Sequence, residues 1–206
     1  MLRASLTVIC AAALLAAASL TPATVFATPA AAPAAAVTHY TLDPAKSSLE
    51  FVFTQAGALN KGHFARFPVS LDFAADNLAA SRLEVGVEVT SLDSGDKDRD
   101  DTLRSADLFA VAKFPQANFS AAQIVKTAAG YEAAGKLTIR GVTRDVRVPF
   151  TFRTASEQGA AVGYMNGKVT IRRLDFGVGQ GDWKATDQVG NDVVVSFALR
   201  LSAATH

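Results

Sequence analysis

Apolar and polar residues alternate with a period of two along two neighbouring runs in the middle of the chain. In the first run, Tyr131–Ile139, the odd-numbered residues are apolar or small, and in the second, Val146–Phe152, the even-numbered residues are apolar. Such alternation gathers apolar side chains on one face of a pleated strand, whereas helical spacing would scatter them. Gly141 lies between the runs and supplies a turn. The pattern therefore predicts an antiparallel hairpin with one apolar and one polar face.

The same alternation recurs along the rest of the chain. It predicts about eight strands, mostly joined as sequential hairpins, with a glycine-rich loop over residues 175–191 before the last strand. Strands in this number either stack as two sheets or close into a barrel. We favour an all-β, antiparallel, eight-stranded barrel, although the alternation alone is also compatible with a sandwich. Besides the central hairpin, strands are predicted over residues 39–43, 49–55, 69–73, 82–89, 118–125, 162–173 and 192–202.

One segment breaks the alternation and predicts a single short helical insertion. Acidic residues crowd Asp96–Asp101, and Arg104 follows them. Negative charge at the start and positive charge at the end suit a helix dipole, and Asp100 and Arg104 are spaced to pair on one face. We therefore expect a helix over Asp98–Leu108. The acidic cluster lacks the closing Glu of an EF-hand loop, which favours a helical turn over a calcium site.

The first 27 residues have the features of a secretory signal peptide. Arg3 gives a positive start, Leu6–Leu20 is apolar, and small residues precede a cleavage site after Ala27. The apolar run falls short of the roughly 20 residues that a membrane span needs. Residues 28–38, rich in Pro and Ala, predict a tether, and residues 39–203 predict one domain. Because Cys10 leaves with the signal, the mature chain would depend on core burial rather than disulfides.

The charge balance limits the classes of partner. The formal net charge is +1, and removal of the signal with its one arginine leaves equal numbers of basic and acidic side chains. No basic stripe persists, so nucleic acid and anionic surfaces are poor candidates as main partners. After the signal, no stretch is apolar and long enough to span a membrane, so we expect a protein that is not integral to the membrane.

Catalytic and metal-binding patterns are missing from the sequence. Its histidines are His39, His63 and His206, and no two of them stand at metal-ligand spacing. A nucleophile elbow, a phosphate loop and a dinucleotide fingerprint are all absent. Gly177–Gly181 is glycine-rich but lacks the following helix that would direct amides at a phosphate. We therefore expect no enzyme activity, no catalytic residue, no metal and no cofactor.

The apolar positions instead suggest enclosed space. An eight-stranded barrel either fills its interior with side chains or keeps room for one small ligand. Large phenylalanines share these registers with very small residues, and small residues inside a barrel would leave a channel suited to an aliphatic guest. Alternatively, the glycines only permit bending or close packing. The small residues in question are Ala133, Gly135, Ala161, Gly163 and Gly167.

Four ordered motifs resemble one known family. They are LDPAKSSLEFVF (Leu42–Phe53), RDDTLRSADLFAVAKFPQANF (Arg99–Phe119), GKLTIRGVTRDV (Gly135–Val146) and RRLDFGVGQ (Arg172–Gln180). Together they resemble the YceI-like family of exported bacterial proteins over residues 39–201. The resemblance implies a lipocalin-like antiparallel barrel in the periplasm, whose hydrophobic channel holds a polyisoprenoid or a prenylquinone tail. It also implies that the helical insertion helps to close one end of the barrel.

Finer features of the resemblance point to a respiratory context. Gln55–Ala58 and Asp175–Trp183 are most similar to members associated with membrane b-type cytochromes, which implies a quinone context by association only. Lys46 stands where many members have a histidine before the first strand motif. A head-group contact made by that histidine in relatives would be changed here. The family pattern supplies no catalytic residue.

The sequence therefore predicts a non-enzymatic carrier of a long isoprenoid amphiphile. The alternative is a filled barrel that docks a membrane respiratory partner, such as a b-type cytochrome, without cargo. A monomer and a homodimer are not distinguished. The head group is expected near Leu103, Leu108, Phe109 or Trp183. Wall contacts, for each of which ordinary core packing is an equal alternative, are expected from Phe51, Phe53, Leu71, Phe73, Val85, Val87, Phe119, Leu137, Ile139, Val148, Phe150, Phe152, Ile171, Val195, Phe197 and Leu199.

Overall fold

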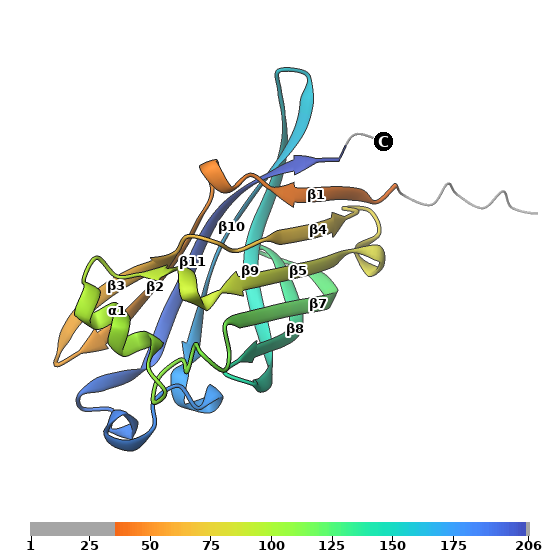
Figure 1. The fold of residues 1–206 in the computed structure, drawn as a ribbon. Coiled ribbons are helices and arrows are strands. Elements are labelled where there is room, and N and C mark those ends of the chain that lie inside the picture. The colour runs from red at the N-terminus through yellow and green to blue at the C-terminus, as the bar shows by residue number, and fades with distance from the viewer. Residues whose placement is uncertain (1–35, 205–206) are drawn as a thin grey trace, which may run out of the picture. The chain divides into compact units, whose positions relative to one another are not determined.

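A computed structural model describes residues 36–204, which form an antiparallel β-barrel (Figure 1). The pairing order runs β1-β4-β5-β7-β8-β9-β10-β11-β2-β3-β6, and β1 also pairs with β11, which closes the barrel. The strands are β1 (Thr38–Leu42), β2 (Ser48–Gln55), β3 (Ala58–Phe64), β4 (Val69–Phe73), β5 (Arg82–Glu88), β6 (Leu92–Asp93), β7 (Gln116–Thr127), β8 (Gly130–Ile139), β9 (Val142–Glu157), β10 (Ala160–Arg172) and β11 (Val189–Ala203).

These strands make eight barrel strands because three of the eight are interrupted. The long strand β11 pairs with β2 along most of its length and with β1 at its end, so β1 and β2 act as one. On the other side of this strand, β4 pairs with β1 and β3 pairs with β2, so β3 and β4 also act as one. Between β3 and β4 the chain stays beside β5 and the residue before β6, because Gly86 N–H donates to Pro68 O (2.9 Å) and Ala65 N–H to Ser91 O (3.1 Å). The predicted eight-stranded antiparallel barrel is confirmed.

Two-residue turns join three of the hairpins. At each turn both central residues have positive φ: 48° and 77° at Ala56–Gly57, 49° and 73° at Arg140–Gly141, and 51° and 83° at Gln158–Gly159. Positive φ at both positions defines the type I′ turn, whose twist matches that of antiparallel strands. The predicted central hairpin is therefore present as β8 and β9, with Tyr131 opposite Phe150.

The helical insertion is α1 (Lys97–Arg104), the single α-helix within residues 36–204. The Asp96 side chain accepts a hydrogen bond from the Arg99 amide (3.0 Å) and caps the helix, and Asp100 lies 3.9 Å from Arg104. The predicted end at Leu108 is wrong. The helix stops at Arg104 because the chain folds back on itself, and Ala110 N–H donates to Ser105 O (2.7 Å).

Five short 3₁₀ helices complete the described chain. They lie between consecutive strands, and the last two are in the connection between β10 and β11. Their bounds are η1 (Pro44–Lys46), η2 (Leu78–Ala80), η3 (Val89–Ser91), η4 (Arg173–Phe176) and η5 (Gly181–Lys184). No helix within residues 36–204 combines the length and apolar character needed to traverse a bilayer. The predicted signal peptide lies outside the described residues, as does most of the tether.

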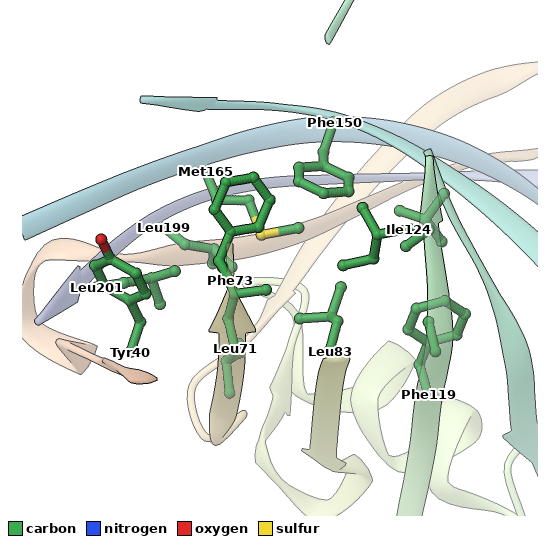
Figure 2. Packing of buried hydrophobic residues seen from close by; sticks show 14 of the residues in the cluster. Tyr40, Leu71, Phe73, Leu83, Phe119, Ile124, Phe150, Met165, Leu199 and Leu201 are labelled. Carbon is green, nitrogen blue, oxygen red and sulfur yellow. The ribbon is translucent and has the colours of Figure 1, made fainter. Parts of the chain in front are cut away.

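One end of the barrel is filled by its own side chains (Figure 2). Leu71 and Leu201 are fully buried there, and Phe73 packs against Phe152 with ring centroids 4.6 Å apart. Figure 2 shows Tyr40, beside Leu201, as part of the same cluster. This end, from here called the closed end, is packed with side chains from β1, β4, β9 and β11.

Of the two interpretations that the sequence left open for the small residues, a channel or close packing, the structure shows close packing. A Cβ at Gly163 would lie 2.7 Å from the Phe152 ring, one at Gly167 2.3 Å from the Phe197 ring, and one at Gly135 2.3 Å from the Ser120 carbonyl. Ala133 is fully buried, and Ala161 is exposed. These positions let rings and backbones approach closely, which was the alternative interpretation.

Candidate ligand cavity

The other end of the barrel encloses a cavity of about 680 Å³. Its wall is formed by inward-facing side chains of the barrel strands and by residues of α1 and of the loop between β10 and β11. Sites for small molecules usually measure about 300–1,000 Å³ and are mostly apolar. The volume and the lining both fall in that class.

Valines of intermediate size, rather than glycines, leave this space. Five inward-facing residues that line the cavity are only half buried, although other inward residues of the same strands are buried. They are Val85, Val87, Val146, Val169 and Val195. An inward side chain that stays accessible inside a closed barrel lies against unfilled volume. The cavity is therefore a consequence of side-chain size in the middle of the strands.

Most of the predicted contact residues lie on the cavity wall. Leu103 lies on α1, Leu108 and Phe109 follow that helix, and Trp183 lies in η5, so the expected head-group region is part of the same wall. The predicted residues that line the cavity are Phe51, Phe53, Val85, Val87, Leu103, Leu108, Phe109, Phe119, Leu137, Ile139, Val148, Ile171, Trp183, Val195, Phe197 and Leu199.

Four predicted residues lie elsewhere. Leu71, Phe73, Phe150 and Phe152 belong to the closed end and do not line the cavity. Their alternation is the same as that of the lining residues, but rings and aliphatic chains fill the space around them. They are core residues in this structure, so a direct ligand contact is not supported for them.

The mouth of the cavity is where its lining residues are solvent-exposed. These exposed residues are Ala56 and Ala58, at the tip of the β2–β3 hairpin, and Asp96 and Asp98, at the start of α1. The Arg99 amide donates to Asp96, and this hydrogen bond lowers the Asp96 pKa. Sequence reasoning missed the polar lining residues Gln55, Asn60, Asp96, Asp98, Arg99 and Thr102.

One charged side chain is buried in the wall. Arg173 is 5% exposed and donates to the carbonyls of Val178 (2.9 Å), Val189 (2.7 Å) and Gly190 (2.9 Å). Burial lowers the Arg173 pKa, because desolvation disfavours the charged form. No carboxylate within residues 36–204 forms a salt bridge with it. Its hydrogen bonds hold the loop between β10 and β11 against the barrel.

A second arginine links the segments that cover the end of the barrel. Arg140, in the β8–β9 turn, donates from Nη1 to Gly177 O (2.9 Å) and from Nη2 to Ala106 O (2.6 Å). The amides of Gly179 and Gln180 donate to Asp107 O, at 3.0 and 2.8 Å. These hydrogen bonds join the segment after α1 to the loop after β10. Leu108, in the first of these segments, packs in one cluster with Ile171 of the cavity wall.

The wall offers little for catalysis. The guanidinium of Arg173 donates its hydrogen bonds to main-chain carbonyls, and the lining carboxylates, Asp96 and Asp98, lie at the solvent-exposed mouth. Across residues 36–204, no three His, Cys, Asp or Glu side chains gather as metal ligands would. The arrangement is suited to enclosing an apolar molecule whose polar end remains near the mouth.

A closed eight-stranded antiparallel barrel around an apolar cavity defines the chain as a lipocalin-like barrel. A sequence profile described as YceI-like domain matches residues 40–201. A UPF0312 protein of Vibrio vulnificus is 31% identical over 152 residues, which cover 70% of this chain and 80% of that protein. A UPF0312 protein of Yersinia enterocolitica is 40% identical over 85 residues, and the match spans 41% of this chain and only 44% of that relative's length.

Solved structures show the same fold. BcnA of Burkholderia cenocepacia is 34% identical, with a TM-score of 0.70 over 80% of this chain and 99% of that one. A polyisoprenoid binding domain from Saccharophagus degradans, 17% identical, has a TM-score of 0.59 over 80% of this chain and 98% of its own. The chain belongs to the YceI-like family, which confirms the resemblance seen in its motifs. The likeness to members associated with b-type cytochromes stays a prediction.

Proposed function

We propose that this protein is a non-enzymatic binding protein that carries a long-chain polyisoprenoid or prenylquinone-type amphiphile in its barrel. The observation that supports this most directly is the apolar cavity of about 680 Å³, which opens between α1 and the β2–β3 hairpin. The name of the Saccharophagus degradans domain, a polyisoprenoid binding domain of the same fold, agrees with it. The protein would act in the periplasm after removal of residues 1–27.

Affinity would come from burial of the tail. Each CH₂ group moved from water into an apolar site contributes about 0.8 kcal/mol, so a few isoprene units suffice for firm binding. The tail would lie along Val85, Val169 and Val195, whose side chains have free space beside them. The head group would remain near Arg99 and Trp183 at the mouth, where water and polar side chains can satisfy it.

A cargo-free docking module is the rival function. Such a barrel would present its outer face or loops to a membrane respiratory partner and would need no interior space. The accessible valines of the wall favour cargo, because an apolar cavity lowers stability and a ligand bound in it offsets that loss. A b-type cytochrome could still be the acceptor of the cargo, in which case both roles would coexist.

Organic extraction of the freshly purified, exported protein, followed by mass spectrometry, tests the proposal. We expect one apolar molecule per chain. Val169→Trp, which fills the middle of the cavity, should remove that molecule, whereas Thr170→Trp, at the exposed neighbouring position of β10, should not. An empty extract from the unaltered protein, with no uptake of added prenylquinone, would refute the carrier and favour the docking module.

A further inference from the structure

The cavity ends at one level of the barrel. On β10, Met165 lines the cavity and the next inward residue, Gly163, does not; on β11, Leu199 lines it and Leu201 does not. Met165 faces Leu199 in the register of these strands, and Gly163 faces Leu201. The boundary between cavity and core therefore falls at the same height on both strands.

A floor of tightly buried side chains marks this boundary. Met165 and Leu83 are 1% exposed and Leu199 is 6% exposed, whereas Val169 and Val195, nearer the mouth, are half buried. Figure 2 shows Met165 and Leu199 in the same cluster as Leu83. We use the term floor for Leu83, Met165 and Leu199.

Aromatic rings fill the space behind the floor. Phe152 lies opposite Met165 in the register of β9 and β10 and occupies the space beside Gly163. Its ring centroid is 4.6 Å from that of Phe73 and 5.4 Å from that of Tyr40. Protein cores packed in this way do not admit an extra chain without strain, so a tail cannot pass beyond the floor.

We infer that the floor sets the longest isoprenoid tail that the barrel encloses. This inference rests on the proposed function and adds a length selectivity to it. Each further isoprene unit strengthens binding until the end of the tail reaches Met165. Units beyond that length stay at the mouth in contact with water, and they add little to the affinity.

A series of prenyl alcohols tests the inference on the exported protein stripped of lipid. We expect the affinity to rise from geraniol through farnesol and geranylgeraniol, and to stop rising at one member of the series that extends to solanesol. Met165→Ala deepens the cavity, and the first alcohol beyond that limit should bind roughly tenfold more tightly. Val85→Phe, which fills the volume just above the floor, should move the limit to a shorter alcohol.

Ile124→Ala is the matched control, because Ile124 is a buried residue of the main cluster that does not line the cavity. It should lower stability and leave the length limit unchanged. Val85→Phe keeps the test decisive if Met165→Ala fails to fold. Binding with the same limit in all folded variants would overturn the floor alone, while absence of binding to every alcohol would overturn the proposed function as well.

Discussion

Arg173 occupies an inward-facing position two residues beyond Ile171, where the alternation predicts an apolar side chain. Its guanidinium meets no acidic partner in the described chain and instead donates to carbonyls on the loop and on β11. Hydrogen bonds from a charged donor are roughly twice as strong as neutral ones. Arg173 is therefore a positioning residue, which holds the loop bearing Trp183 at the edge of the cavity.

Arg173→Met should lower the free energy of unfolding by about 3 kcal/mol, because it leaves several buried carbonyls without a donor. Urea denaturation measures this loss. Arg172→Met is the control: Arg172 is exposed, and its nearest acid, Asp175, lies 3.9 Å away, so only a small change is expected. Equal losses in the two variants would contradict the role given to Arg173.

Arg173 also shows what residue-level reasoning could have found. Extension of the inward register of residues 165–171 by one step places a charge inside the barrel, and that is a recognisable signal. The polar residues at the mouth, such as Gln55, Asn60 and Thr102, give no comparable signal. They reach the cavity only because a hairpin tip and a helix come together from separate parts of the chain.

At the level of elements, the alternation and the turn at Gly141 predicted the central hairpin, whereas no comparable pattern predicted β3. Arg140–Gly141 joins the two strands whose alternation is clearest, and its turn also packs against Phe114. The strand β3 was not predicted as a strand, because Gly62 and Asn60 interrupt its pattern. Gly62 is required there for packing, since a Cβ would lie 2.4 Å from the Phe51 ring.

Gly141→Ala should destabilise the protein more than Gly57→Ala does. Both glycines have positive φ, 73° and 77°, so both variants strain the backbone by about 1 kcal/mol. At Gly141 the new Cβ would also lie 2.7 Å from the Phe114 ring, whereas at Gly57 it would meet nothing within 4 Å. Thermal unfolding of both variants compares them, and a larger loss at Gly57 would contradict this account of the turn.

At the level of the whole molecule, the alternation predicted which way side chains face but not how far the cavity extends. Phe51 and Phe53 line the cavity, while Leu71 and Phe73, with the same alternation, fill the closed end. The difference arises from the interrupted strands: β1 and β4 form one end of the barrel and β2 and β3 the other. These strand pairings join residues that are far apart in sequence, so a local pattern of apolar and polar residues cannot predict them.

The single tryptophan of the chain, Trp183, lines the cavity near its mouth and gives the most direct test of the central claim. The measurement is a fluorescence titration of the lipid-stripped protein with a short-chain ubiquinone, whose ring quenches a neighbouring indole. We predict quenching that saturates at one quinone per chain and that disappears when farnesol competes for the cavity. Quenching that grows linearly without saturation, as for free tryptophan, would contradict the account.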